Sequence, residues 1–112
     1  MPRVKKKILI DLDGVLNTYN GNYDENYIPE IRQGAFEFIQ ELSLNYELIL
    51  FTSRDKMLAT SWIQKNGLTE FFKKVTNYKE PCFLIIDDRC LTFDGCYKKL
   101  KNKINLFQVW YK

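Results

Sequence analysis

The sequence predicts an α/β fold with a mostly parallel sheet, formed by one domain over residues 1–112. Short apolar runs near 7–12, 47–51 and 83–86 are typical of strands that are buried on both faces of a parallel sheet. Helical spacing of apolar residues lies between these runs, so strands and helices alternate along the chain. With 112 residues, 46% of them hydrophobic, the chain can close one core and is too short for two domains.

The first half of the chain gives the clearest elements. A strand over 7–12 has an apolar centre, and the segment 17–29 reads as a loop because it is rich in Asn, Tyr and Gly. Apolar residues at helical spacing predict a helix over 32–44. The run ELILF then predicts a second strand over 47–51.

In the second half, Asp55 suits the N-cap of a helix that ends at Asn66-Gly67. The remaining expected elements are a short helical turn within 68–74, a strand over 83–86, a helix over 95–101 and a last strand over 104–110.

Composition excludes several kinds of chemistry. The chain has no histidine, which rules out Ser-His-Asp and Cys-His catalysis and histidine-bound metals. Its three cysteines form no C-x-x-C pair, so we expect reduced thiols and neither a disulfide framework nor a zinc site. No stretch approaches the roughly 20 apolar residues of a membrane span, and we expect a cytoplasmic protein without a membrane contact. A net charge of +3 does not by itself indicate nucleic acid.

Each predicted buried strand ends in polar residues that could form a site. Taken alone, Asp11-x-Asp13-Gly14 is usually a turn or cap, Thr52-Ser53-Arg54 a helix start, and Asp87-Asp88-Arg89 a solvated loop. In an open parallel sheet, however, ligands bind beyond the carboxyl ends of the strands, so all three clusters should face one crevice. Carboxylates that lie so close need a cation, and an all-oxygen site suits Mg²⁺. We expect Mg²⁺ to be held by Asp11, Asp13, Asp87 and Asp88.

These same segments resemble the motifs of the haloacid dehalogenase superfamily. ILIDLDGVLN looks like its first motif, hhhDxDG, LILFTSR like its second, and FLIIDDR like the Asp-Asp form of its last. The resemblance covers roughly residues 7–95 and implies a three-layer, Rossmann-like fold. Within the superfamily, the second and last motifs are similar to those of polynucleotide 3′-phosphatases and deoxyribonucleotidases.

The resemblance also implies roles for individual residues. Asp11 would be the nucleophile and a metal ligand, and Asp13 the general acid/base that also binds metal through its backbone carbonyl. Thr52 would hydrogen-bond the transferring phosphoryl group, and Ser53, Arg54 and Gly14 would contact the substrate. Asp88 would bind the metal directly, with Asp87 in support.

The source of a positive charge opposite the phosphoryl group is left open by the sequence. The superfamily places a lysine before the last motif strand, and Lys79 is the candidate, although it stands only eight residues before Asp87. An ordinary loop lysine is the alternative, in which case Arg54 or Lys56 would supply the charge.

The expected substrate is a phosphorylated molecule, with a nucleotide, a nucleic-acid end, a sugar and a protein all open. The segments between the motifs leave no room for a cap domain, and open members of the superfamily serve large substrates or borrow a lid, so a homo-oligomer is open too. Tyr19, Tyr23 and Tyr27 would stack on a base or sugar, or anchor the loop onto the domain.

Two other functions compete with a phosphatase. One is a receiver-like signalling module that accepts phosphate on an aspartate, but in receivers the acidic pair follows the first strand, whereas here the adjacent pair follows the third predicted strand and is the last of the three clusters. The other is a phosphate-binding module without turnover, whose mark would be the loss of the first aspartate. Asp11 is present.

Overall fold

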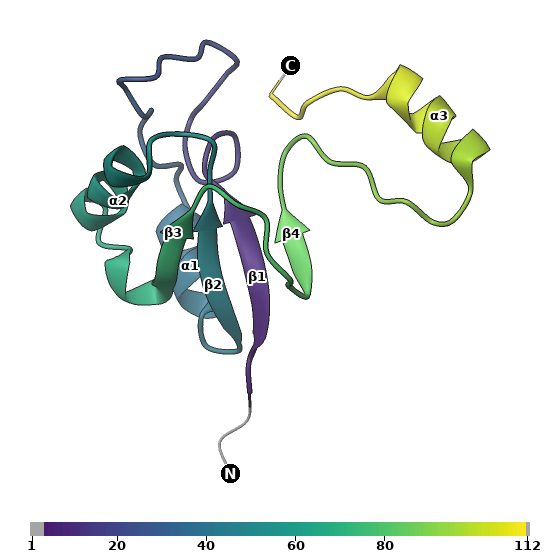
Figure 1. Cartoon of the computed structure of the whole chain (residues 1–112). Coiled ribbons are helices and arrows are strands. Elements are labelled where there is room, and N and C mark those ends of the chain that lie inside the picture. Colours follow the sequence, from purple (N-terminus) through teal and green to yellow (C-terminus); the bar gives the residue numbers. More distant parts are fainter. Residues whose placement is uncertain (1–3, 112) are drawn as a thin grey trace.

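The computed structural model describes residues 4–111 and confirms the α/β fold. Four parallel strands form one sheet in the order β3-β2-β1-β4, and Figure 1 shows the helices around it. The elements along the chain are β1 (Lys6–Asp11), α1 (Ala35–Leu42), β2 (Tyr46–Phe51), α2 (Lys56–Lys65), the 3₁₀ turn η1 (Thr69–Phe71), β3 (Phe72–Thr76), β4 (Leu84–Ile86) and α3 (Tyr97–Leu106).

The core lies on one face of the sheet. Ile8 and Ile10 of β1 point to this face and pack with Leu48 and Leu50 of β2. Both α1 and α2 bury their apolar side chains in the same cluster, so the two helices share this face (Figure 1). Burial of these aliphatic side chains contributes roughly 1.5–3 kcal/mol each to the free energy of unfolding.

The opposite face is covered by the connection between β3 and β4. Glu80 of this connection pairs with Lys7 of β1 at 2.8 Å and with Lys74 of β3 at 2.8 Å, so residues 77–83 pass across the sheet. Beneath this connection, Leu9 and Ile49 are completely buried. The connection therefore carries the chain from one edge of the sheet, past β2 and β1, to β4.

Most sequence-based boundaries agree with the structure to within three residues. Asp55 caps α2 as predicted, with its carboxylate accepting from the Leu58 N–H at 3.0 Å, and α2 stops at Asn66-Gly67. Helix α1 begins three residues later than predicted because Gly34 precedes it in a left-handed conformation, with φ of 89°.

At the edges of the sheet one strand was missed and one prediction is wrong. The short helical turn predicted within 68–74 is present as η1, but the strand β3 that starts at Phe72 was missed, because its sequence FKKVT carries two lysines and lacks a continuous apolar run. Charged side chains are common on edge strands, and β3 is one. The strand predicted over 104–110 is instead the end of α3 followed by a chain without regular structure, so β4 stays an edge among the described residues.

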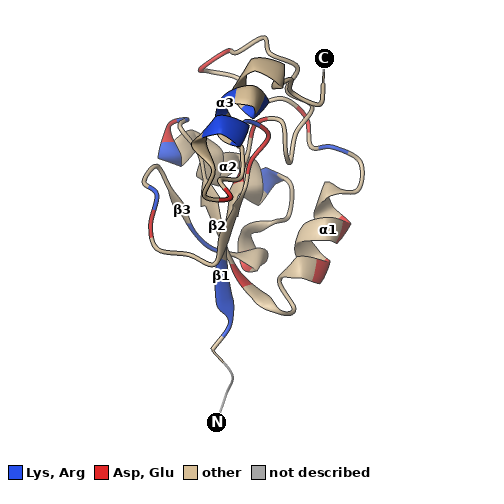
Figure 2. Cartoon of the chain, turned by 90° about the vertical axis from the view of Figure 1, so that its right-hand side faces the viewer, with Lys and Arg blue, Asp and Glu red and all other residues tan. Residues whose placement is uncertain are grey.

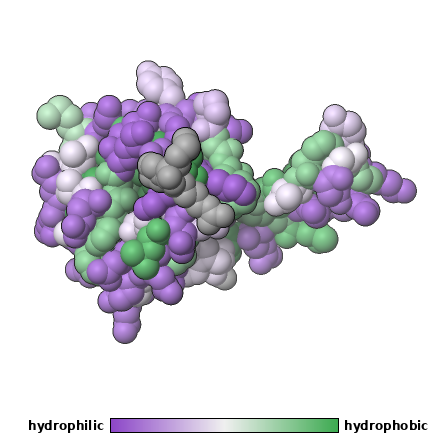
Figure 3. Space-filling view, turned by 90° about the horizontal axis from the view of Figure 1, so that it is seen from below, coloured by the Kyte–Doolittle hydropathy of each residue, from purple (hydrophilic) through white to green (hydrophobic). Residues whose placement is uncertain are grey.

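Helix α3 stands away from the body. None of its residues is buried, and Figures 1 and 3 show it as a lobe beside the sheet domain. We call residues 90–109, which include α3, the C-terminal arm. Four lysines lie on it, seen in blue in Figure 2. The chain returns to the body at Trp110, whose indole N–H donates to the Gly14 carbonyl at 2.7 Å. In the part of the chain that the structure describes, no helix is both long and apolar enough to cross a membrane.

The burial of Leu9 gives a first prediction. Leu9→Ala should lower the free energy of unfolding by about 2–5 kcal/mol, since it opens a cavity under the β3–β4 connection. Leu44→Ala is the matched control because Leu44 is 70% exposed, and it should change that free energy by less than about 0.5 kcal/mol. Urea denaturation followed by circular dichroism measures both, and equal losses would contradict the described packing.

Candidate active site

Three carboxylates meet at the carboxyl edge of the sheet. Strand β1 ends at Asp11, and the β1–β4 register aligns Ile10 with Ile86, so Asp87 emerges beside Asp11. Each of Asp11, Asp87 and Asp88 offers an oxygen that lies within 4.8 Å of the others. The sequence predicted this convergence from the ends of two strands that are 75 residues apart.

The local electrostatics disfavour three negative charges in so small a space. Burial, followed by the neighbouring charges of Asp87 and Asp88, raises the pKa of Asp11 to about 8. Burial is also the largest cause that raises the pKa of Asp88, and its contact with Asp87 adds to it. A cation among the three groups would reverse this balance and hold all of them ionised.

The cluster is suited to a hard metal ion. Asp88 Oδ2 is buried, and among residues 4–111 it has no hydrogen-bond partner. An unpartnered buried carboxylate oxygen is costly, and a cation would satisfy it. The donors of the cluster are all carboxylate oxygens, the ligands that Mg²⁺ prefers.

A crevice of about 290 Å³ opens over these groups. It is formed by side chains from the ends of β1, β2 and β4 and from the loop after β1. The lining residues are Asp11, Asp13, Tyr19, Tyr23, Phe51, Ser53, Asp87, Asp88 and Arg89. A lining of four carboxylates, a hydroxyl, a guanidinium and two tyrosines suits a phosphorylated ligand that is bound together with a cation.

The fourth predicted carboxylate, Asp13, lines the crevice but is not part of the cluster. Its two oxygens are held by Arg54, with Nε 2.8 Å from Oδ2 and Nη2 3.1 Å from Oδ1. Asn17 Nδ2 donates to the same Oδ1 at 3.1 Å. The Asp13 side chain therefore lies in a fixed orientation beside the three clustered carboxylates.

The second predicted cluster forms a tight turn after β2. Thr52 is buried, and its hydroxyl oxygen accepts from the Arg54 N–H at 3.1 Å. The Asn77 side chain donates to the carbonyls of both residues, at 2.6 and 2.8 Å. Ser53, in this turn, lines the crevice, and its contact with a substrate stays a prediction.

Four predicted site residues lie outside the crevice lining: Thr52, which is buried in the turn after β2, and Arg54, Gly14 and Lys79. Arg54 is buried and faces Asp13, so its guanidinium is not among the crevice lining. Both backbone groups of Gly14 are occupied, the N–H by Asn17 Oδ1 and the carbonyl by Trp110. Lys79 is exposed on the β3–β4 connection, outside the lining, and its catalytic role stays a prediction.

Several supporting residues were missed by the sequence reasoning. Asn17 was read as part of a loop, yet it is completely buried and holds Gly14 and Asp13 together. Tyr111, which accepts from Arg89 at 2.8 Å, lies against Gly14 and was assigned to no site. An asparagine shortly after an apolar run was the available signal for Asn17, while the contacts of Tyr111 depend on the tertiary fold.

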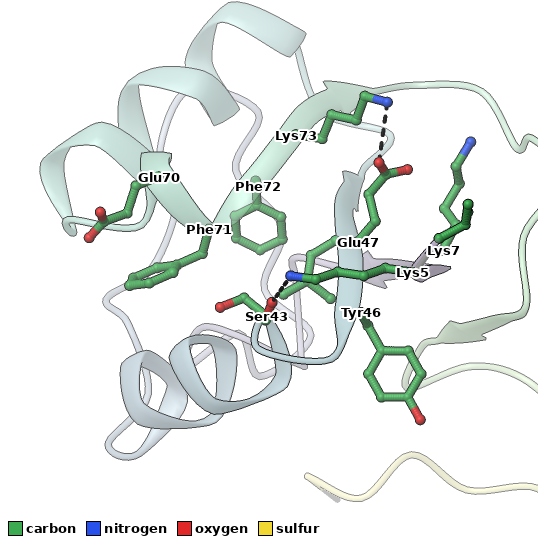
Figure 4. Close-up of a pocket in the computed structure, with 11 residues that line it drawn as sticks. Lys5, Lys7, Ser43, Tyr46, Glu47, Glu70, Phe71, Phe72 and Lys73 are labelled. Atoms are coloured by element: carbon green, nitrogen blue, oxygen red, sulfur yellow. Dashed lines mark hydrogen bonds and ion pairs between the residues drawn. The ribbon is translucent and has the colours of Figure 1, made fainter. Parts of the chain in front are cut away.

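A larger cavity, of about 820 Å³, lies at the opposite end of the sheet. Most of its charged groups already have partners, since Lys5 donates to the Ser43 carbonyl at 3.0 Å and Lys73 pairs with Glu47 at 3.2 Å (Figure 4). It gathers residues from the amino ends of β1, β2 and β3, whereas ligands of parallel sheets bind at the carboxyl ends.

The fold and the carboxylate crevice define a phosphate-processing α/β protein, and comparison with known proteins names the class. The model of the NLI interacting factor-like phosphatase family matches residues 6–105, and the chain belongs to this family. It is therefore a phosphatase of the capless, haloacid dehalogenase-like kind, as the sequence motifs had indicated.

Similarity to other proteins is otherwise distant. A solved structure of a conserved protein from Bacteroides thetaiotaomicron is similar with a TM-score of 0.59 and 19% identity, over 92% of each chain. At that identity the similarity supports the fold alone. No curated protein matches the sequence significantly.

The close approach at Gly14 gives a second prediction. A Cβ at this position would collide with the Asp88 carboxylate, and φ is 82°, so Gly14→Ala should both strain the backbone and displace Asp88. Gly34→Ala is the matched control, because Gly34 has φ of 89° and nothing within 4 Å of the added carbon. The control should lose about 1–2 kcal/mol of unfolding free energy from backbone strain, and Gly14→Ala more. Equal losses in urea titrations would contradict the contact with Asp88.

Proposed function

We propose that the protein hydrolyses a phosphate monoester in a Mg²⁺-dependent reaction through a phosphoaspartate on Asp11. The observation that carries the proposal is the set of three clustered carboxylates with one buried, unpartnered oxygen on Asp88. A metal bound by Asp11, Asp87 and Asp88 would supply charge neutralisation for the phosphoryl oxygens and the nucleophile.

The two carboxylates at the end of β1 divide the chemistry between them. Asp11 attacks phosphorus and displaces the leaving alkoxide, which takes a proton from Asp13 as the ester bond breaks. Asp13 then removes a proton from water, which attacks the acyl phosphate and releases inorganic phosphate and free Asp11. A carboxylate nucleophile in this way divides one slow hydrolysis into two easier steps.

The remaining polar groups of the crevice suit recognition of the phosphoryl oxygens. Ser53 lines the crevice, whereas Thr52, the residue before it, is buried beneath the turn and would reach a phosphoryl oxygen only if the turn shifted. Among the described lining residues, Arg89 is the cation, held by Tyr111 at its edge. We propose Arg89 as the positive charge opposite the phosphoryl group, with Lys79 as an alternative that requires the β3–β4 connection to move toward the crevice.

The substrate is proposed to be large or exposed, because no cap domain is inserted between the elements that form the crevice. Tyr19 and Tyr23 stand at the rim and could stack on a base or another planar group. We propose that the single domain over 1–112 carries the whole activity, in the cytoplasm, and that any lid comes from another copy or from the substrate.

Metal removal tests the proposal and has a pH dependence. Hydrolysis of p-nitrophenyl phosphate should require Mg²⁺ and disappear with EDTA. Without metal, Asp11 has a pKa of about 8 in the folded protein against 3.8 in its ordinary range, so between these values the folded state holds a proton that the unfolded chain has lost. The free energy of unfolding should then fall as pH rises through this window, and Mg²⁺ should raise the melting temperature more at pH 8 than at pH 6. Full activity in EDTA would refute the metal requirement.

Substitution of the nucleophile tests the covalent step. Asp11→Asn should lower kcat at least about 10³-fold, since a neutral amide does not attack phosphorus. Asp94→Asn is a matched control, because Asp94 lies on the C-terminal arm outside the crevice, and it should retain wild-type kcat. Mass spectrometry of acid-quenched wild-type enzyme should show a phosphoryl adduct on the peptide that contains Asp11. Activity of Asp11→Asn within tenfold of wild type would place the nucleophile elsewhere.

A further inference from the structure

We propose that Arg54 is a positioning residue, which fixes the orientation of Asp13. Arg54 also connects Asp13 to the tyrosine loop, the segment 17–29 after β1 that carries Tyr19, Tyr23 and Tyr27. This inference rests on the proposed role of Asp13 as general acid/base. It replaces the sequence-based expectation that Arg54 contacts the substrate.

The contact between Arg54 and Asp13 is a two-point one. The guanidinium Nε lies 2.8 Å from Oδ2 and Nη2 lies 3.1 Å from Oδ1, while the Arg54 side chain is 0% exposed. Two parallel N–H···O bonds from a rigid fork fix the plane of a carboxylate as well as its distance. Asn17 Nδ2 adds a third donor, to Oδ1, so the side chain of Asp13 has little rotational freedom.

The other side of the same guanidinium holds the tyrosine loop. Arg54 Nη1 donates to the Asp24 carbonyl at 2.7 Å, and the Tyr23 ring lies 4.6 Å from the guanidinium carbon. With Nε, Nη1 and Nη2 all engaged and the side chain buried, the guanidinium is not presented to a substrate phosphate. One planar group therefore joins the general acid/base to two neighbouring residues of the loop.

This arrangement gives the tyrosine loop a direct connection to the chemistry. Tyr23 lines the crevice and is 54% exposed, and its ring packs against Arg54. A substrate that touches Tyr23 therefore touches a direct neighbour of the residue that orients Asp13. Proton transfer to a leaving oxygen demands a heavy-atom distance of about 2.6–3.2 Å, and small displacements of the acid are costly. Arg54 should thus matter most when the leaving group needs a proton.

Phenyl phosphate and p-nitrophenyl phosphate distinguish positioning from general damage, because they share a ring and differ in the basicity of the leaving group. Arg54→Lys keeps the charge but lacks the fork. We expect its kcat/KM to fall at least tenfold more for phenyl phosphate than for p-nitrophenyl phosphate. Combining it with Asp13→Asn should add nothing further to this ratio, because the two residues act as a unit.

Arg32→Lys is the matched control. Arg32 also lies over an aromatic ring, 4.2 Å from Trp110, but no carboxylate contact of its guanidinium is found among residues 4–111. Its ratio of kcat/KM values for the two substrates should equal that of wild type. A ratio that is likewise unchanged in Arg54→Lys, with both substrates still hydrolysed, would overturn the positioning role and leave the proposed phosphatase mechanism intact.

A second measurement is independent of turnover. In ¹⁵N-labelled protein without substrate, the Nε–H of Arg54 should exchange slowly with solvent and become fast in Asp13→Ala. The Nε–H of Arg89, whose residue is exposed, is the internal reference for fast exchange. Fast exchange of the Arg54 signal in wild type would show that the contact with Asp13 is absent in solution, whatever the enzyme assays give.

Discussion

Repulsion among Asp11, Asp87 and Asp88 is the constraint around which the carboxyl edge of the sheet is organised. Three carboxylates within 4.8 Å are stable together only if some are protonated or a cation joins them. The parallel register of β1 and β4 nevertheless forces Asp87 beside Asp11. Gly14 has no side chain at the point where Asp88 approaches, so the fold lets Asp88 come close to the other two carboxylates. The fold therefore maintains the repulsion among the three groups. A divalent cation bound among the three carboxylates would offset this repulsion.

The sequence predicted those parts of the site that depend on strand ends. Asp11, Ser53, Asp87 and Asp88 reach one crevice because parallel strands present their carboxyl ends at one edge. Lys79 was expected from the superfamily's order of motifs, despite its short distance from Asp87, and the Glu80 contacts hold that connection across the sheet, away from the crevice. Side-chain partnerships such as that of Arg54 with Asp13 join positions 41 residues apart, which periodicity and local motifs do not encode.

The absence of tertiary contacts from local sequence patterns also explains which strands and helices were predicted correctly and which were not. Central strands carry continuous apolar runs because both faces are buried, and β1 and β2 were found for that reason. Strand β3 is an edge whose two lysines interrupt the signal. Residues 104–106 alternate between apolar and polar side chains, which suggested a strand. A strand must pair its backbone with a neighbouring strand, whereas a helix satisfies its own backbone hydrogen bonds. No residue of α3 is buried, so no packing contact favours the strand over the helix.

The strand order has a consequence for how the enzyme is made. Pairing of β1 with β2 and of β2 with β3 joins segments about 25 to 40 residues apart, whereas the paired Ile10 and Ile86 are 76 residues apart along the chain. Closing that longest loop costs the most entropy and belongs late in assembly. Asp87 and Asp88 arrive with β4, so a chain still emerging from the ribosome has Asp11, the proposed nucleophile, in place before these two proposed metal ligands. Metal capture would then mark the completion of folding, and an unfinished chain would be catalytically silent.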